Sequence, residues 1–248
     1  PSPTMTMRIC ILETDILRPQ LIEQYHGYGR MFRQLFEKQS IPAQFDVFNV
    51  VEGCYPDAAQ GYDAYLITGS KADSFGTDPW IQTLREFLLE RYDNGDRLIG
   101  ICFGHQLLAL LLGGKTERAA QGWGIGVNRY ALLEQPEWMS PSLEHLDMLV
   151  FHQDQVTELP TGATLLASSP FCPNAAYRIG DQVLCFQAHP EFVDDYELGL
   201  LNLRREFLGE ARYQQAVSSM SLQHQGVAVA EWMLRFASQE RAQNSLAA

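Results

Sequence analysis

One cysteine of this chain lies in a sequence context that could make it a nucleophile. Residues 100–104 read G-x-C-x-G around Cys102, directly after Arg97–Ile101, a short apolar run typical of a strand. In such a turn the backbone two residues before the nucleophile passes close to the backbone two residues after it, so glycine suits both places. The spacing predicts a sharp strand-to-helix turn, or elbow, that presents the Cys102 thiol.

Such an elbow has chemical consequences. The thiol would lie at the N-terminus of a helix, where the helix dipole favours the thiolate. The backbone N–H of Phe103 would point to the place where an oxyanion forms during attack on a carbonyl group. The alternative interpretation is a buried structural cysteine between two glycines that end a strand.

A thiol nucleophile needs a base, and the base needs a partner that orients it. His189 follows the apolar run 183–188, which predicts a strand, and Glu191 comes two residues later. Side chains at i and i+2 of an extended segment point to the same side, so Glu191 could hold the imidazole. The alternative is a surface turn after a strand. His105 lies on the helix that leaves the elbow, and we expect it to pack or cap.

The flanking segments predict how these residues are positioned. Apolar runs predict strands, and apolar residues at helical spacing predict the helices between them. The predicted strands are 8–14, 43–50, 64–68 and 97–101, and the predicted helices are 25–39, 78–92 and 104–112. Strands that alternate with helices predict an α/β fold with a doubly wound, mostly parallel sheet flanked by helices.

After Gly113-Gly114 the pattern changes to shorter strand-like segments, several of which resemble antiparallel additions to the sheet. These segments are 126–133, 148–151, 164–168, 175–179 and 182–187. From Asp194 onward the pattern is helical, with Trp232, Met233 and Phe236 on one face. We expect a disordered lead-in at 1–7, a catalytic domain at 8–195, and a helical C-terminal extension at 196–248 packed on the same domain.

Composition narrows the class of protein. The 248 residues are 46% hydrophobic and 19% charged, which is ordinary for an ordered globular chain. The formal net charge is −12 and no basic run offers a stripe for phosphates, so we expect no nucleic acid partner.

The cysteines and the length of the apolar runs indicate in which cellular compartment the protein would occur. Five cysteines occur without a C-x-x-C pair, which predicts no zinc site and fits free thiols in a reducing, cytoplasmic compartment. Cys10 and Cys185 lie within apolar runs, and we expect them to be buried. The longest apolar stretch, Leu107–Leu112, is too short to span a membrane, and the first residues do not resemble a signal peptide.

The two motifs together resemble the class I, or triad, glutamine amidotransferase family. That family's elbow reads G-x-C-x-G-x-Q, which extends the match to Gln106, and its second motif is an H-P-E that ends a strand, matched here by His189, Pro190 and Glu191. The resemblance covers roughly Arg8 to Asp195. It implies a flavodoxin-like α/β fold and a catalytic triad of Cys102, His189 and Glu191.

The resemblance also implies further site residues. Gly69 or Ser70, in the loop after a strand, would complete the oxyanion hole with Phe103, although an ordinary glycine turn is the alternative. His152, Gln153 and Asp154 belong to an H-x-D-x-V segment that borders the γ-glutamyl pocket in the family; without the resemblance this segment predicts a polar loop. Gln106 would contact the α-amino or α-carboxylate end of the glutamyl group.

The implied reaction is hydrolysis of a γ-glutamyl amide through a thioester on Cys102, with His189 as the proton carrier and no metal or organic cofactor. Residues 69–81 and 121–126 resemble free-standing family members, some of which cleave γ-glutamyl peptides, including glutathione conjugates. This favours a hydrolase acting on a small γ-glutamyl substrate. The alternative within the family is a glutaminase subunit that supplies ammonia to a separate synthetase partner.

Two other classes stay open. The DJ-1/PfpI group shares the elbow, but its histidine usually comes from next to the nucleophile, and the intact His189–Glu191 motif argues against it. A non-catalytic module that kept the fold is the other, and the complete triad argues against that.

Overall fold

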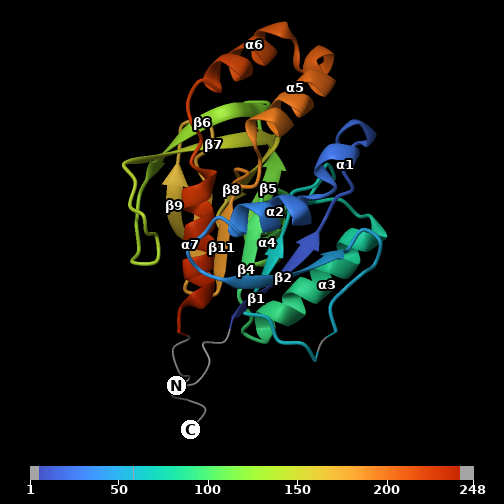
Figure 1. Cartoon of the computed structure of the whole chain (residues 1–248), viewed down its shortest axis with the longest axis vertical. Coiled ribbons are helices and arrows are strands. Elements are labelled where there is room, and N and C mark those ends of the chain that lie inside the picture. Colours follow the sequence, from blue (N-terminus) through green and yellow to red (C-terminus); the bar gives the residue numbers. More distant parts are fainter. Residues whose placement is uncertain (1–5, 58, 241–248) are drawn as a thin grey trace.

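A computed structural model describes residues 6–57 and 59–240 of the chain (Figure 1). Its helices are α1 (Pro19–Tyr25), α2 (Tyr28–Phe36), α3 (Pro79–Asp93), α4 (Phe103–Leu111), α5 (Asp194–Leu208), α6 (Glu210–Ser219) and α7 (Gly226–Ser238). Its strands are β1 (Met7–Glu13), β2 (Ala43–Asn49), β3 (Ala64–Ile67), β4 (Leu98–Ile101), β5 (Lys115–Arg118), β6 (Gly124–Leu132), β7 (His145–His152), β8 (Asp154–Glu158), β9 (Thr164–Ser168), β10 (Ala176–Ile179) and β11 (Val183–Phe186).

The main sheet confirms the predicted fold class. Its strand order is β2-β1-β3-β4-β11-β10-β9-β6-β7. The pairs from β2 to β11 are parallel, and the pairs from β11 to β7 are antiparallel. The neighbouring parallel strands β3, β4 and β11 therefore end at the same edge of the sheet, where a doubly wound fold places its site.

Helices cover both faces of the parallel half of the sheet, and alternate side chains of a strand pack into the two cores on either side. Ile9 and Ile11 of β1 pack with α2 and α7 in one core, whereas Cys10 and Leu12 pack with α3 and α4 in another. A strand that is apolar on both faces is typical of a parallel sheet buried by crossover helices. In Figure 1, α5 and α6 lie above β6 and β7, and α7 crosses the sheet beside α2.

The C-terminal helices share the core of the sheet. Trp232, Met233 and Phe236 of α7 are fully buried together, as their spacing predicts, in the same cluster as Ile9 and Ile101. This shared core supports our proposal that the C-terminal extension packs on the catalytic domain. Residues 1–5 and 241–248 of the expected lead-in and extension lie outside the described residues, and β1 begins at Met7.

Helices α1 and α2 and strands β5 and β8 differ from the sequence predictions. Helix α1 was not predicted, and the helix expected at 25–39 begins only at Tyr28, because His26 adopts a positive φ of 66° that ends α1. The segment 152–156, which without the family resemblance predicts a polar loop, instead contains the start of β8. Strand β8 pairs with the unpredicted β5 in a second, two-stranded sheet.

No helix among the described residues is long and apolar enough to cross a membrane.

Candidate active site

Cys102 occupies the predicted elbow between β4 and α4. Its backbone has φ 52° and ψ −101°, a strained conformation for a residue with a side chain. A Cβ on Gly100 would lie 2.6 Å from the Gly104 backbone, and a Cβ on Gly104 would collide with the Ile67 carbonyl. Glycine is therefore required on both sides of the elbow. The close approach that the sequence suggested explains Gly100, whereas Gly104 is required by its contact with Ile67 of β3.

The elbow is fixed by backbone hydrogen bonds. The Cys102 N–H donates to the Phe186 carbonyl at 2.9 Å, and the Cys102 carbonyl accepts from the Gln106 N–H at 3.0 Å. The Gln187 side-chain amide donates to Cys102 Sγ at 3.5 Å. Strands β4 and β11 thus hold the sulfur between them at the wall of a pocket.

His189 and Glu191 form a buried pair, with His189 Nδ1 2.9 Å from Glu191 Oε2. The backbone N–H of His189 donates to the Leu149 carbonyl at 2.9 Å. The imidazole ring of His189 stacks on the Phe192 ring, with the ring centroids 3.8 Å apart. Because Nδ1 is engaged with Glu191, Nε2 is the nitrogen available to a reacting group. The expected contact between His189 and Glu191 is present, but Pro190 and Glu191 lie in a turn and not in the extended segment on which that expectation rested.

Burial alone would lower the pKa of His189, but the Glu191 carboxylate and the nearby Cys102 outweigh it and raise that pKa to about 10. The imidazole therefore holds a proton at neutral pH.

Gly69 lies against both the candidate nucleophile and the candidate base. A Cβ at Gly69 would lie 2.6 Å from His189 Cε1 and 3.5 Å from both His189 Nε2 and the Cys102 Cβ. Only a residue without a side chain fits there with the imidazole in place.

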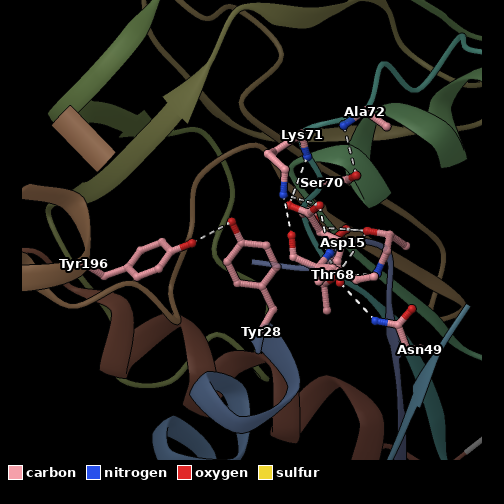
Figure 2. A network of polar contacts seen from close by, with 11 residues as sticks. Asp15, Tyr28, Asn49, Thr68, Ser70, Lys71, Ala72 and Tyr196 are labelled. Atoms are coloured by element: carbon pink, nitrogen blue, oxygen red, sulfur yellow. Dashed lines mark hydrogen bonds and ion pairs between the residues drawn. The ribbon is translucent and has the colours of Figure 1, made fainter. Parts of the chain in front are cut away.

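The loop that carries Gly69 and Ser70 is anchored by a polar network (Figure 2). The Thr14 hydroxyl lies 2.9 Å from the Thr68 and Gly69 carbonyl oxygens, and the Thr14 N–H donates to Thr68 Oγ1 at 3.0 Å. Beside them, Lys71 Nζ lies 2.7 Å from Asp15 Oδ1. Strand β1 and the segment after it therefore fix the position of the loop expected to complete the oxyanion hole. Phe103 is the first residue of α4, where a backbone N–H has no partner within the helix.

Cys102 and His189 line a pocket of about 160 Å³ together with Ser70 and the residues expected to bind the glutamyl group. Those residues are Gln106, His152, Gln153 and Asp154, and all four lie on the pocket wall. Gln106 Nε2 donates to the Asp154 carbonyl at 3.0 Å, and His152 Nδ1 lies 3.2 Å from the same oxygen. Burial lowers the pKa of His152 to about 4, so this imidazole is neutral at neutral pH.

The structure adds pocket residues that the sequence did not suggest. Arg118 on the unpredicted strand β5 pairs with Asp154 at 3.1 Å and with Asp73 at 3.0 Å. Arg18, which directly precedes α1, and Arg204 on α5 also line the pocket. Phe192 could have been suspected because it directly follows the H-P-E motif, whereas no local pattern identifies the three arginines.

The other candidate histidine and the thiols lie as expected. His105 is fully buried against Tyr177, with ring centroids 5.0 Å apart, and burial lowers its pKa to about 3. It packs inside the fold, as predicted. Cys10 and Cys185 are buried, and all five cysteines are free. Across the described ranges, no cluster of three or more His, Cys, Asp or Glu side chains could hold a metal ion.

Known proteins resemble the chain along most of its length. The profile of the family described as glutamine amidotransferase class-I matches residues 24–200. Gamma-glutamyl peptidase 3 of Arabidopsis thaliana is 33% identical over 203 residues, which cover 76% of this chain and 81% of that protein. Gamma-glutamyl peptidase 4 of the same plant is 35% identical over 178 residues, covering 69% and 70%. The solved structure of a glutamine amidotransferase from Thermotoga maritima has a TM-score of 0.76 at 16% identity, over 95% of this chain and 100% of that one, and shows the shared fold.

Proposed function

The chain belongs to the class I glutamine amidotransferase family, and we propose that it is a free-standing hydrolase of γ-glutamyl amide bonds in small γ-glutamyl peptides and amines. The observation that carries this proposal is the buried His189–Glu191 pair, joined at 2.9 Å, that contacts Cys102 at the strained elbow. The similarity to γ-glutamyl peptidases supports the choice of substrate class over glutamine alone.

The first half of the reaction forms a thioester. The Cys102 thiolate attacks the γ-carbonyl carbon of the glutamyl group, and the N–H groups of Phe103 and the loop at 69–70 stabilise the oxyanion. His189 Nε2 then donates its proton to the leaving nitrogen as the carbon–nitrogen bond breaks. The amine departs, and the γ-glutamyl group is left bonded to Cys102 Sγ.

The second half regenerates the enzyme. The now neutral His189 takes a proton from water, and the hydroxide attacks the thioester carbonyl. Glutamate leaves as the carbon–sulfur bond breaks, so the thiolate and the protonated imidazole are restored. Glu191 keeps the proton on Nδ1 in both halves and stabilises the imidazolium. Every step uses side chains and backbone groups of this chain, and the proposal needs no metal or organic cofactor.

We propose that the polar wall of the pocket holds the glutamyl group. Asp154 and Asp73 offer carboxylates for the substrate α-amino group, and Arg118 between them offers a cation for its α-carboxylate. Gln106, His152 and Gln153 complete this wall. The free state of all five thiols fits a reducing compartment, so we propose a cytoplasmic protein.

The test is glutamate release by the purified chain alone, from glutamine and from a panel of γ-glutamyl peptides and amines. We expect release from γ-glutamyl peptides well above release from glutamine. Release from glutamine alone, or only after a cell extract is added, would replace the proposal with a glutaminase subunit that serves a synthetase partner. No release from any γ-glutamyl compound, with or without extract, would contradict hydrolysis altogether.

A further inference from the structure

Two arginines line the pocket, and neither has an anionic partner in the part of the chain that the structure describes. Arg18 directly precedes α1 and Arg204 lies on α5, and both are half-buried in the pocket wall. The Nε of each is buried with no hydrogen-bond partner among the described residues, and neither forms an ion pair there. The guanidinium carbon of Arg204 lies 4.2 Å from the centroid of the Phe207 ring.

Other cations near the pocket are neutralised. Lys71 pairs with Asp15 at 2.7 Å, and Arg118 pairs with Asp73 and Asp154. Burial, and then the proximity of Arg18, lower the pKa of Arg204, so the two guanidinium groups lie close enough to repel each other. In a chain with a formal net charge of −12, an unneutralised cationic pair in a pocket predicts an anionic ligand.

The pair lies on the His189 side of the pocket. Leu17, Tyr28, Phe192 and Leu200 form one apolar cluster, and Phe192 stacks on the His189 ring at 3.8 Å. Arg18 follows Leu17 in the chain. Arg204 lies four residues after Leu200 on α5, so both share one face of that helix. The charged residues proposed to hold the glutamyl group lie elsewhere: Arg118 is on β5, and its partner Asp154 is on β8.

The proposed reaction determines which half of the substrate lies on the His189 side of the pocket. His189 gives its proton to the leaving nitrogen, so the amine half must lie next to His189. A substituent on that nitrogen extends along the apolar cluster toward Arg18 and Arg204. A planar guanidinium group matches a carboxylate through two parallel hydrogen bonds, which a neutral amide cannot accept in the same way.

We propose that Arg18 and Arg204 form a carboxylate subsite for the leaving half of the substrate. The preferred substrates are then γ-glutamyl amino acids and peptides with a free terminal carboxylate, in preference to γ-glutamyl amines. This specificity rests on the proposed hydrolase function and deepens it. Phe207, which is 62% exposed, contacts both Arg204 and the pocket residue Trp123, whose ring lies 5.9 Å from its own.

The test compares γ-glutamylglycine with γ-glutamylglycinamide, which share the scissile bond and differ in the terminal carboxylate. The measured quantity is the ratio of kcat/KM for the acid to kcat/KM for the amide. We expect Arg204→Gln and Arg18→Gln each to lower this ratio about 10-fold relative to the unmodified chain. The intrinsic reactivity of the two leaving groups cancels when the ratios of two proteins are compared.

Arg205→Gln is the matched control. Arg205 is the next residue on α5, but it pairs with Glu210 at 2.5 Å and does not line the pocket. Its substitution should leave the ratio unchanged. Unchanged ratios in both Arg18→Gln and Arg204→Gln, with hydrolysis intact, would overturn the subsite and leave the hydrolase standing.

A binding measurement separates the subsite from catalysis. Calorimetry with the Cys102→Ala chain compares the dissociation constants of the same acid and amide without turnover. Tighter binding of the acid than of the amide, lost when Arg204→Gln is added, supports the subsite even if the unmodified chain hydrolyses neither compound. The lack of hydrolysis would count against the proposed function alone. Equal binding of acid and amide overturns the subsite.

Discussion

The three buried histidines of this protein show how one carboxylate changes the chemistry of an imidazole. Burial lowers the pKa of His105 to about 3 and that of His152 to about 4. His189 is equally buried, yet Glu191 at 2.9 Å and the neighbouring Cys102 raise its pKa to about 10. Burial penalises the charged form everywhere, and only a close negative charge reverses that result. Glu191 therefore decides that His189 carries the proton.

Substitution of Glu191 by glutamine tests this role. We expect Glu191→Gln to lower the pKa of His189 and to reduce kcat/KM, because the imidazolium loses its stabilising charge. His189→Ala should cost more, about 10²- to 10⁴-fold, because it removes the proton carrier itself. NMR titration of the imidazole and rate measurements check both effects. An equal or larger rate loss in Glu191→Gln, with folding unchanged, would contradict the assigned roles.

Gly69 sets the spacing between the nucleophile and the base. Gly69→Ala would place a Cβ 2.6 Å from His189 Cε1, so the ring must move. A displacement of about 1 Å can cost about 100-fold in rate, and we expect a loss of that order in kcat/KM with little change in stability. Gly61→Ala is the control, since no atom lies within 4 Å of its Cβ. Equal activities of the two variants would show that His189 tolerates displacement.

At the scale of elements, three adjacent parallel strands build the site. The chain leaves β3 at the loop containing Gly69, leaves β4 at Cys102, and leaves β11 shortly before His189. Strand β4 pairs in register with both β3 and β11, so these residues meet at one edge although they are distant in sequence. The pairing of these three strands therefore brings the site residues together without the movement of a loop.

The elbow depends on close contact between α4 and the strands. Gly100→Ala and Gly104→Ala each introduce a Cβ that meets backbone atoms, which cannot yield as a side chain can. We expect each to lower the free energy of unfolding by about 1–3 kcal/mol, the usual cost of overpacking. Urea unfolding of both variants against Gly61→Ala measures this. Stabilities equal to that control would mean that the elbow is less tightly packed than described.

The sequence predicted the parts of the site whose causes are local. The glycines around Cys102 follow from the steric demands of the elbow. The spacing of His189 and Glu191 pointed to their contact, although a turn and not extended backbone brings them together. Strands β5 and β8 were missed because their pairing joins segments far apart in the chain and their outward side chains are polar. Arg118 and Arg204 were missed for a related reason, because a surface arginine becomes a pocket residue only through tertiary packing.

At the scale of the whole molecule, the buried histidines link stability to pH. A histidine whose folded pKa lies below 6.5 stabilises the fold above that pH, and the contribution is lost as the pH falls toward the folded pKa. For His105 and His152 the window runs from 6.5 down to about 3 and about 4. His189 has the opposite sign: its contribution is present below pH 6.5 and is lost as the pH rises toward about 10.

The loss of stability at acid pH can be tested with His105, a residue outside the pocket. We expect His105→Gln to flatten the fall in unfolding free energy between pH 6.5 and 4, by at most about 1.4 kcal/mol per pH unit, because one fewer group takes up a proton on unfolding. Urea unfolding at several pH values gives both slopes. The comparison uses the slope, so a uniform loss of stability in the variant does not affect it. Parallel slopes would contradict a neutral, buried His105.

The central claim is that Cys102 carries the γ-glutamyl group during turnover. The most direct measurement is glutamate release from a γ-glutamyl dipeptide by the unmodified chain and by Cys102→Ala, with an acid-quenched sample of each examined by mass spectrometry. We expect a glutamyl adduct on the Cys102 peptide of the unmodified chain, and neither adduct nor glutamate release from a folded Cys102→Ala protein. Release by that variant at the unmodified rate would contradict it.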